Sequence, residues 1–179
     1  EVFHRDLDET LIRPLKKGMT NDSFYLEVDG KSYVLRKNGI GTEELIDRQG
    51  EAAAYQTIAP FQIAEPLVAI CPQKGYKVSE FLQNVHTCRA KDISDVRACM
   101  QKLRRLHSWS LPYRKPFDIL QQIAFYEHLW KQTSRHEDYA EVKDAIFHLT
   151  PLHRLLGRPL CLCHIDAVPD NFLLSEDGR

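Results

Sequence analysis

The spacing of hydrophobic positions changes from one half of the chain to the other. Near the start, apolar and polar residues alternate over two runs, 23–28 and 32–37, a pattern that is typical of strands with one buried face. Asp29 and Gly30 stand between the runs, and this dipeptide is a strong signal for a tight hairpin turn. We therefore expect two antiparallel strands here.

Further runs predict more of the same sheet. Segment 43–59 has apolar residues near helical spacing, although Gly50 lowers its helix propensity. Runs 66–71 and 75–82 are extended and apolar, with turn residues between them. Residues 1–80 are thus predicted to form a small antiparallel sheet with one helix inserted.

The second half has mainly helical periodicity. Stripes of apolar residues predict three helices, at 92–108, 117–132 and 139–150. A proline precedes the second of these helices and another follows the third. Two short apolar runs, 159–163 and 171–174, come last and are predicted to be strands on either side of a polar stretch. The fold class expected is therefore α+β, with a β-rich lobe over 1–80 and a helical lobe over 81–179.

Composition narrows the range of partners. A chain of 179 residues with 43% hydrophobic content can bury a core in one or two compact units. Its formal net charge of −1 offers no field for nucleic acid or for an anionic membrane. No run approaches the roughly 18 apolar residues that span a bilayer. The five cysteines follow no disulfide-like spacing, which favours a reducing, cytoplasmic compartment; the sequence does not indicate an oligomeric state.

The polar stretch between the last two runs carries the strongest chemical pattern. Its spacing is H-x-D-x-x-x-x-N, formed by His164, Asp166 and Asn171. Kinase catalytic loops use an Asp to orient and deprotonate the attacking hydroxyl, and an Asn a few residues later to bind magnesium. The alternative is an ordinary polar turn between two buried strands, because Asp and Asn are common in loops.

Small polar residues precede the first hairpin. Gly18, Thr20, Asn21 and Ser23 could turn backbone N–H groups and hydroxyls toward phosphate oxygens. Taken alone, they equally suit an ordinary loop before a strand. The segment is neither G-x-G-x-x-G nor a Walker loop, which disfavours a standard protein kinase or P-loop enzyme.

A cation and a helical carboxylate follow in the order that kinases use. Arg36 lies on the second strand of the hairpin, where kinases carry a Lys that grips phosphates, and Glu51 lies on the next helix, where they carry its ion-pair partner. Arg is always charged and offers a fork of donors. Each residue alone could be an ordinary surface residue, but the complete order is hard to obtain by chance.

These motifs resemble the choline/ethanolamine kinase family, particularly its bacterial choline kinases. The segments that carry the resemblance are GMTNDSF, YVLRKNGIGTEELIDRQGE, LHS and LCHIDAVPDNFLL, between about Lys17 and Leu174. The family pattern L-R-x-x-G-x-G-T is matched by Leu35, Arg36, Gly39, Gly41 and Thr42. The resemblance implies a protein-kinase-like fold of two lobes, shared with aminoglycoside phosphotransferases, with the nucleotide bound by the first lobe.

The resemblance also implies an activity: transfer of the ATP γ-phosphate to choline or a related amino alcohol, with magnesium as cofactor. Asp166 would be the catalytic base, Asn171 a metal ligand and His164 a support for the loop at 164–171. The nucleotide would be held by Gly18, Thr20, Asn21, Ser23, Arg36, Glu51, which positions Arg36, and the hinge at 78–82 with Glu80. Two alternatives stay open: another acceptor such as ethanolamine, thiamine or an aminoglycoside, and a non-catalytic nucleotide-binding or scaffold protein.

The chain departs from the family pattern at a few positions. The family usually has Asn where this chain has Ile165 and Asp47, and commonly Pro where it has Asn38. A second magnesium ligand, and much of the acceptor pocket, are expected beyond Arg179. The Asp-Gly pair near the end, with no strand after it, predicts that the natural protein continues and that the 179 residues alone are inactive. The sequence does not indicate whether a nucleotidyltransferase domain is attached.

Overall fold

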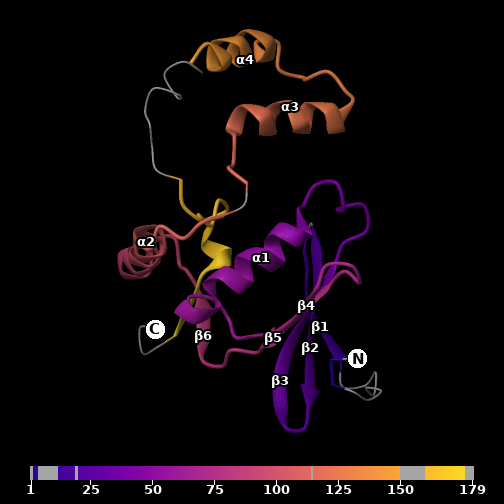
Figure 1. Cartoon of the computed structure of the whole chain (residues 1–179), viewed down its shortest axis with the longest axis vertical. Helices are drawn as coiled ribbons and strands as arrows, with labels where there is room; N and C mark the ends of the chain where they lie inside the picture. Colours follow the sequence, from indigo (N-terminus) through magenta and orange to yellow (C-terminus); the bar gives the residue numbers. More distant parts are fainter. Residues whose placement is uncertain (1, 4–11, 19, 114, 150–159, 176–179) are drawn as a thin grey trace. The chain divides into compact units, whose positions relative to one another are not determined.

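The computed structural model describes residues 2–3, 12–18, 20–113, 115–149 and 160–175 (Figure 1). Its internal contacts divide the chain into two compact units. One unit is formed by Glu1–Leu111 together with Leu162–Arg179, and the other by Pro112–Cys161. The lobe boundary predicted at residue 80 stays a prediction. Asp177 and Gly178, on which the expected final turn depends, lie outside the described residues.

A five-stranded antiparallel sheet forms the centre of the first unit. Its strands lie in the order β1-β2-β3-β5-β4, and their bounds are β1 Ile12–Lys17, β2 Asn21–Val28, β3 Lys31–Asn38, β4 Leu67–Cys71 and β5 Tyr76–Glu80. Asp29 and Gly30 both adopt positive φ, 53° and 71°, as the predicted hairpin turn requires. Sequence patterns predicted four of these strands but not β1, whose sequence IRPLKK shows no alternation.

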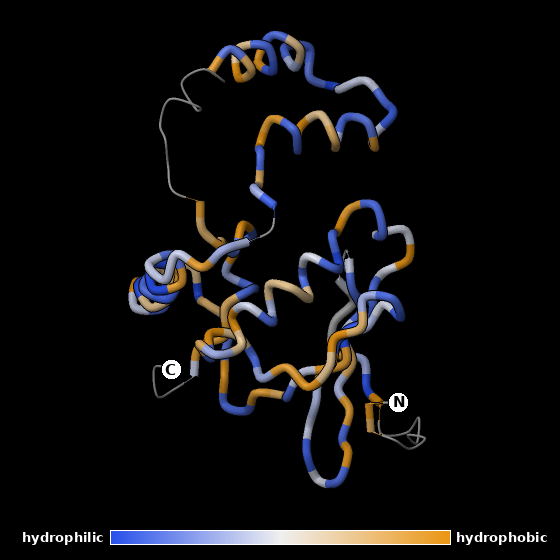
Figure 2. The backbone as a smooth tube through the Cα atoms, viewed as in Figure 1, coloured by the Kyte–Doolittle hydropathy of each residue, from blue (hydrophilic) through white to orange (hydrophobic). Residues whose placement is uncertain are grey.

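The two faces of the sheet differ in character, and Figure 2 shows hydrophobic and hydrophilic residues following one another along the strands. Leu26, Val28 and Val78 share one face and are almost fully buried. Helix α1, Arg48–Ile58, lies against the other face, where Tyr55 of the helix is hydrogen-bonded to Lys77 of β5.

Helix α1 begins later than its hydrophobic pattern predicts. The side chain of Asp47 caps the helix by accepting the Gly50 N–H at 2.8 Å, an arrangement that satisfies a donor left free at a helix start. The residues before Asp47 form turns instead, since the N–H groups of Leu45 and Ile46 both donate to the Thr42 carbonyl. The predicted start at residue 43 was therefore too early, and the 3-10 turn η2 Ala59–Phe61 ends the segment.

The described remainder of the first unit contains a helix, a two-stranded sheet and a short 3-10 turn. Helix α2, Ile93–Ser108, confirms the prediction for this segment. Strand β6, Val85–Thr87, pairs antiparallel with β7, Leu173–Ser175, so the strand predicted at 171–174 is confirmed in its second half. Before β7, residues Pro169–Asn171 form the 3-10 turn η3.

The strand predicted at 159–163 is wrong over its described residues. Residues 160–163 are in no strand, and Leu162 makes one backbone hydrogen bond, from its N–H to the Leu111 carbonyl at 2.7 Å. Alternating apolar residues indicate that one face is buried, but a strand also needs a neighbouring strand with which it forms a ladder of hydrogen bonds. Pro159 lies outside the described residues.

The described residues of the second unit form two helices, α3 Ile119–Trp130 and α4 Tyr139–His148, and both confirm the sequence prediction. Asp118 caps α3 through the N–H groups of Leu120 and Gln121. The two helices are joined at Glu127, which accepts hydrogen bonds from Lys143 at 2.8 Å and from the Tyr139 hydroxyl at 2.9 Å. In the described part of the chain, no helix is long and apolar enough to cross a membrane.

Candidate functional site

The turn between β1 and β2 is tightly folded around Gly18. Its N–H donates to the Asn21 carbonyl at 2.9 Å, and a Cβ at this position would lie 2.7 Å from that same oxygen. Any other residue would therefore force the turn to open. The side chains of Thr20 and Asn21 bond to each other, Asn21 Nδ2 donating to Thr20 Oγ1 at 3.1 Å. Three of the predicted phosphate-binding residues thus form one compact turn.

Arg36 lies in the middle of a row of side chains that crosses the sheet. It is paired with Ser23 on β2 and with Lys77 on β5, and residues directly opposite each other project from the same face. This is the face that α1 covers. The row brings two predicted site residues, Ser23 and Arg36, next to a cation that the sequence patterns did not single out.

A small, open pocket lies beside this row. It is lined by three cations, one carboxylate and five other residues: Arg36, Arg48, Lys77, Glu51, Asn38, Ile70, Cys71, Pro72 and Tyr76. Two of the three cations are paired with carboxylates, Arg48 with Glu51 and Lys77 with Glu65. The excess positive charge of the pocket therefore comes from Arg36, and it suits an anionic group.

Glu51 pairs with Arg48, one turn away on α1, at 3.2 Å. Among the described residues, no ion pair joins Glu51 to Arg36, which was the expected partner, although both side chains line the pocket. Their roles as nucleotide contacts stay predictions.

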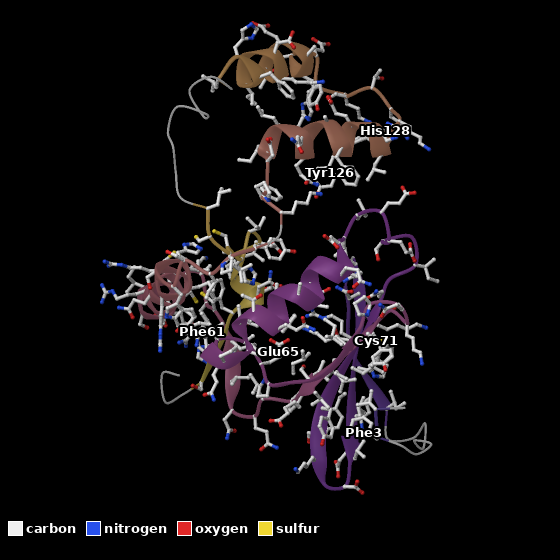
Figure 3. The ribbon with its side chains drawn as sticks, in the orientation of Figure 1. Phe3, Phe61, Glu65, Cys71, Tyr126 and His128 are labelled. Atoms are coloured by element: carbon white, nitrogen blue, oxygen red, sulfur yellow. The ribbon has the colours of Figure 1, made fainter. Side chains whose placement is uncertain are left out.

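A buried cluster of Lys77, Tyr55 and Glu65 lies next to the pocket. The Lys77 ammonium, whose side chain is 6% exposed, donates to the Tyr55 hydroxyl and, at 2.7 Å, to Glu65. Tyr55 in turn donates to Glu65 at 2.9 Å. Figure 3 shows Glu65 between α1 and the strands of the sheet. The three side chains come from α1, from β5 and from the segment before β4, so the cluster ties these elements together.

The electrostatics of this cluster are strongly coupled. Burial raises the pKa of Tyr55, and the neighbouring Glu65 carboxylate raises it further. Burial alone would also raise the pKa of Glu65, but the charge and hydrogen bond of Lys77 outweigh burial and hold that pKa below its usual value. At neutral pH the cluster is therefore a neutral phenol between an ammonium and a carboxylate.

The loop at 164–171 brings the predicted base, Asp166, and the predicted metal ligand, Asn171, together. Asn171, at the end of η3, donates from Nδ2 to the backbone carbonyl of Asp166 at 2.8 Å and to Asp166 Oδ2 at 2.9 Å. Asp166 N–H bonds to the His164 carbonyl at 2.8 Å, and the His164 ring stacks on Phe172 with centroids 6.1 Å apart. Both Asp166 and Asn171 are exposed.

Ile165 has a backbone conformation that its side chain does not favour. Its φ is 65°, in the left-handed region where β-branched residues are outliers. Outliers of this kind concentrate at functional sites, where the surroundings impose them. The strained residue stands between His164 and Asp166.

Two further observations concern ligands. Glu80 ends β5 and is exposed, with its N–H bonded to the Pro66 carbonyl at 2.9 Å, so its adenine-side role stays a prediction. Within the described ranges, no three His, Cys, Asp or Glu side chains gather in a way that could hold a metal ion. A cation at the loop would depend on amide and phosphate oxygens, which magnesium accepts.

The sequence patterns did not predict two cations that line the pocket, Arg48 and Lys77. They also did not predict the two partners of Lys77, Tyr55 and Glu65. Lys77 occupies a position in β5 between Tyr76 and Val78, where a buried cation has no local signature. A Lys within an otherwise extended apolar run was the only available signal, because its partners lie far away along the chain.

Comparison with known proteins gives several matches. The pattern of the phosphotransferase enzyme family matches residues 11–179. Protein LicA of Haemophilus influenzae is 26% identical over 187 residues, covering 99% of this chain and 54% of that protein. The crystal structure of choline kinase LicA from Streptococcus pneumoniae is 28% identical, with a TM-score of 0.81, and the match covers 96% of this chain and 63% of that one. A structure of LicA in complex with AMP is 29% identical, with a TM-score of 0.78, over 94% of this chain and 58% of that one.

These matches confirm the expected resemblance and the kinase-like α+β fold over the part that the chain covers. An aminoglycoside phosphotransferase at 19% identity has a TM-score of 0.60, which extends the likeness in fold alone. The chain spans about half the length of the Haemophilus relative and less than two thirds of the length of the LicA structures.

Proposed function

The chain belongs to the phosphotransferase enzyme family, and from that premise we propose that its protein transfers the γ-phosphoryl group of ATP to the hydroxyl of choline or a related amino alcohol. The observation that carries the proposal is the pair of hydrogen bonds from Asn171 to Asp166. These bonds hold a carboxylate and an amide side by side in the spacing that kinases use for a base and a metal ligand.

Asp166 has the chemistry of the base. Its carboxylate is exposed and anchored through the bond to Oδ2, so it can accept a proton from an acceptor hydroxyl that approaches the loop. In that step the hydroxyl oxygen forms a bond to the γ-phosphorus while the bond from the γ-phosphorus to the bridging oxygen of ADP breaks. Such a reaction needs little covalent help from the protein and depends mostly on positioning and charge neutralisation.

Asn171 has the chemistry of a metal ligand. Because its Nδ2 is used in both bonds to Asp166, the amide oxygen Oδ1 is the atom that would bind magnesium, an ion that prefers oxygen ligands. Bound magnesium would neutralise charge on the phosphate oxygens during transfer. His164 supports the loop by stacking on Phe172.

The sheet supplies the cationic side of the proposed site. Arg36 lines the pocket beside α1 and would hold the phosphates of the nucleotide. The compact turn around Gly18 would cover them. The LicA structure in complex with AMP supports a nucleotide as the ligand, and the choline kinase LicA supports choline as the acceptor.

The test is ADP release by protein that contains these 179 residues, with magnesium-ATP and a panel of acceptors. Choline, ethanolamine, thiamine and an aminoglycoside would be compared at equal concentration, with the phosphorylated product identified by phosphorus NMR. We expect release that depends on an amino alcohol, and choline to give the highest kcat/KM. Binding of ATP without turnover of any acceptor would overturn the proposal and favour a non-catalytic nucleotide-binding protein.

A further inference from the structure

The guanidinium of Arg48 joins three segments that are separate in sequence. Its Nη2 donates to the Thr20 carbonyl at 3.2 Å and to Thr42 Oγ1 at 3.3 Å, and its Nη1 pairs with Glu51 at 3.2 Å. Thr20 belongs to the β1–β2 turn, Thr42 to the loop after β3, and Glu51 to α1. We propose that Arg48 is a positioning residue that anchors the β1–β2 turn to α1, a role that rests on the proposed function of that turn as the phosphate cover.

We call the hydrogen bonds among Thr20, Gly39, Thr42 and Arg48 the joint. The Thr20 carbonyl is at its centre. It accepts a second hydrogen bond, from the Gly39 N–H at 2.9 Å, so two donors from different segments hold one oxygen of the turn. A Cβ on Gly39 would lie 3.1 Å from the same oxygen, which shows how closely the two backbones approach. The position of the turn is therefore set through Thr20 and not through its own side chains.

Thr42 closes the joint on its other side. Its hydroxyl accepts from Arg48 and donates to the Gly39 carbonyl at 2.8 Å, and the residue is only 5% exposed. The hydroxyl thus uses its donor and an acceptor lone pair within the joint, which satisfies a buried polar group. Gly39, Thr42 and Arg48 consequently form a closed set of bonds around the turn.

The geometry calls for a guanidinium and not merely for a positive charge. Arg48 bonds in different directions from Nη1 and Nη2, while its side chain is 12% exposed. A planar fork of donors can do this, whereas the compact ammonium of Lys cannot span the same acceptors. Two buried groups at the joint have no partner among the described atoms, Nε of Arg48 and Oδ1 of Asn21.

A positioning role and a direct phosphate contact predict different results for Arg48→Lys. If Arg48 bound phosphate through its charge, Lys would keep most of the affinity. If Arg48 anchors the turn, Lys should lose nearly as much as Arg48→Gln, about tenfold in ATP affinity, as expected for the loss of a charged hydrogen bond. AMP and adenosine lack the terminal phosphates that the turn would cover, so their affinities should change less than about twofold.

The experiment combines nucleotide titration by calorimetry with amide hydrogen exchange on wild type, Arg48→Lys, Arg48→Gln, Thr42→Ser and Thr42→Val. Arg104→Gln, at an exposed position on α2, is the matched control for loss of an arginine. We expect faster exchange at the Gly39 amide and at residues 18–21 in both Arg48 variants and in Thr42→Val, with unchanged exchange in α2. Thr42→Ser and Arg104→Gln should behave as wild type.

The outcomes separate the anchor from the proposed function. Unchanged exchange at Gly39 in the Arg48 variants, equal losses for ATP and AMP, or full rescue by Arg48→Lys would each overturn the anchor. If an Arg48 variant unfolds, Thr42→Val alone decides, because it removes one acceptor and keeps the arginine. If wild type binds no ATP but the exchange effect is present, the proposed function fails and the anchor stands.

Discussion

One amide nitrogen of Asn171 holds Asp166 at two points, through the backbone carbonyl at 2.8 Å and through Oδ2 at 2.9 Å. The amide nitrogen carries two hydrogens and donates to both the main chain and the carboxylate, which fixes the position of Asp166 and the rotation of its side chain. The loop therefore presents a carboxylate that is oriented although it is exposed.

Asp166→Asn tests whether that carboxylate is the base. The replacement keeps an oxygen that can accept from Asn171 but removes the proton acceptor, so turnover should fall by roughly two to four orders of magnitude. ATP affinity should change far less, because the base faces the acceptor. The measurement is choline-dependent ADP release beside an ATP titration, with Asp144→Asn on α4 as control. Turnover near the wild-type rate in Asp166→Asn would show that another group takes the proton.

Ile165→Asn should stabilise the protein. Ile165 has a φ of 65° and a side chain that is 60% exposed, so the replacement relieves strain and loses little burial. Asn tolerates the left-handed region much better, and the gain should be about 1 kcal/mol. Denaturant midpoints at constant slope measure it. Ile165→Val, which keeps the branched Cβ, should give no such gain; an equal gain in both variants would mean that strain is not the cause.

Local chemistry explains which parts of the fold were predictable from sequence. The hairpin at Asp29-Gly30 was predictable because a turn with two positive φ values selects its residues directly. The spacing of Asp166 and Asn171 singled out their loop, but it did not predict the two hydrogen bonds between them. Strand β1 was missed because Pro14 and three basic residues hide its pairing with β2.

The contact between Lys77 and Glu65 beside the pocket could not be predicted from the sequence, for a different reason. Lys77 and Glu65 are separated by a whole strand, β4, and their contact exists only once β4 and β5 have paired. Glu51 was expected to pair with Arg36, but the competing Arg48 lies one turn away on the same helix. Which cation pairs with a given carboxylate depends on the distances between side chains in the folded structure, and spacing along the sequence does not determine those distances.

Lys77→Met should destabilise the protein by about 3 kcal/mol, because it leaves the carboxylate of Glu65 without its ammonium in a largely buried cluster. Glu65→Gln should cost a similar amount by leaving the buried ammonium unpaired. The double variant should lose less than the two single losses added together, since neither charge is then left alone. Chemical denaturation of the four proteins gives this cycle. Strictly additive losses would show that the two charges do not interact.

Asp95 predicts the response of stability to acid. It is 4% exposed and accepts hydrogen bonds from the side chain and backbone N–H of Arg89, which hold its pKa well below the ordinary value of 3.8. A carboxylate with a lowered folded pKa adds stability above its unfolded pKa, and this stability is lost as the pH falls toward the folded value.

Asp95→Asn should therefore be less stable than wild type, by a constant margin above about pH 5. The margin should shrink as the pH falls below 3.8, because the unfolded chain then takes up a proton that folded wild type, with its lowered pKa at Asp95, does not yet bind. Arg89→Gln should show the same profile, since it removes the other half of the interaction. Urea unfolding from pH 3 to pH 7 measures all three proteins. A margin that widens on acidification would mean that Asp95 is stabilised in its protonated form, and that the hydrogen bonds from Arg89 do not set its charge.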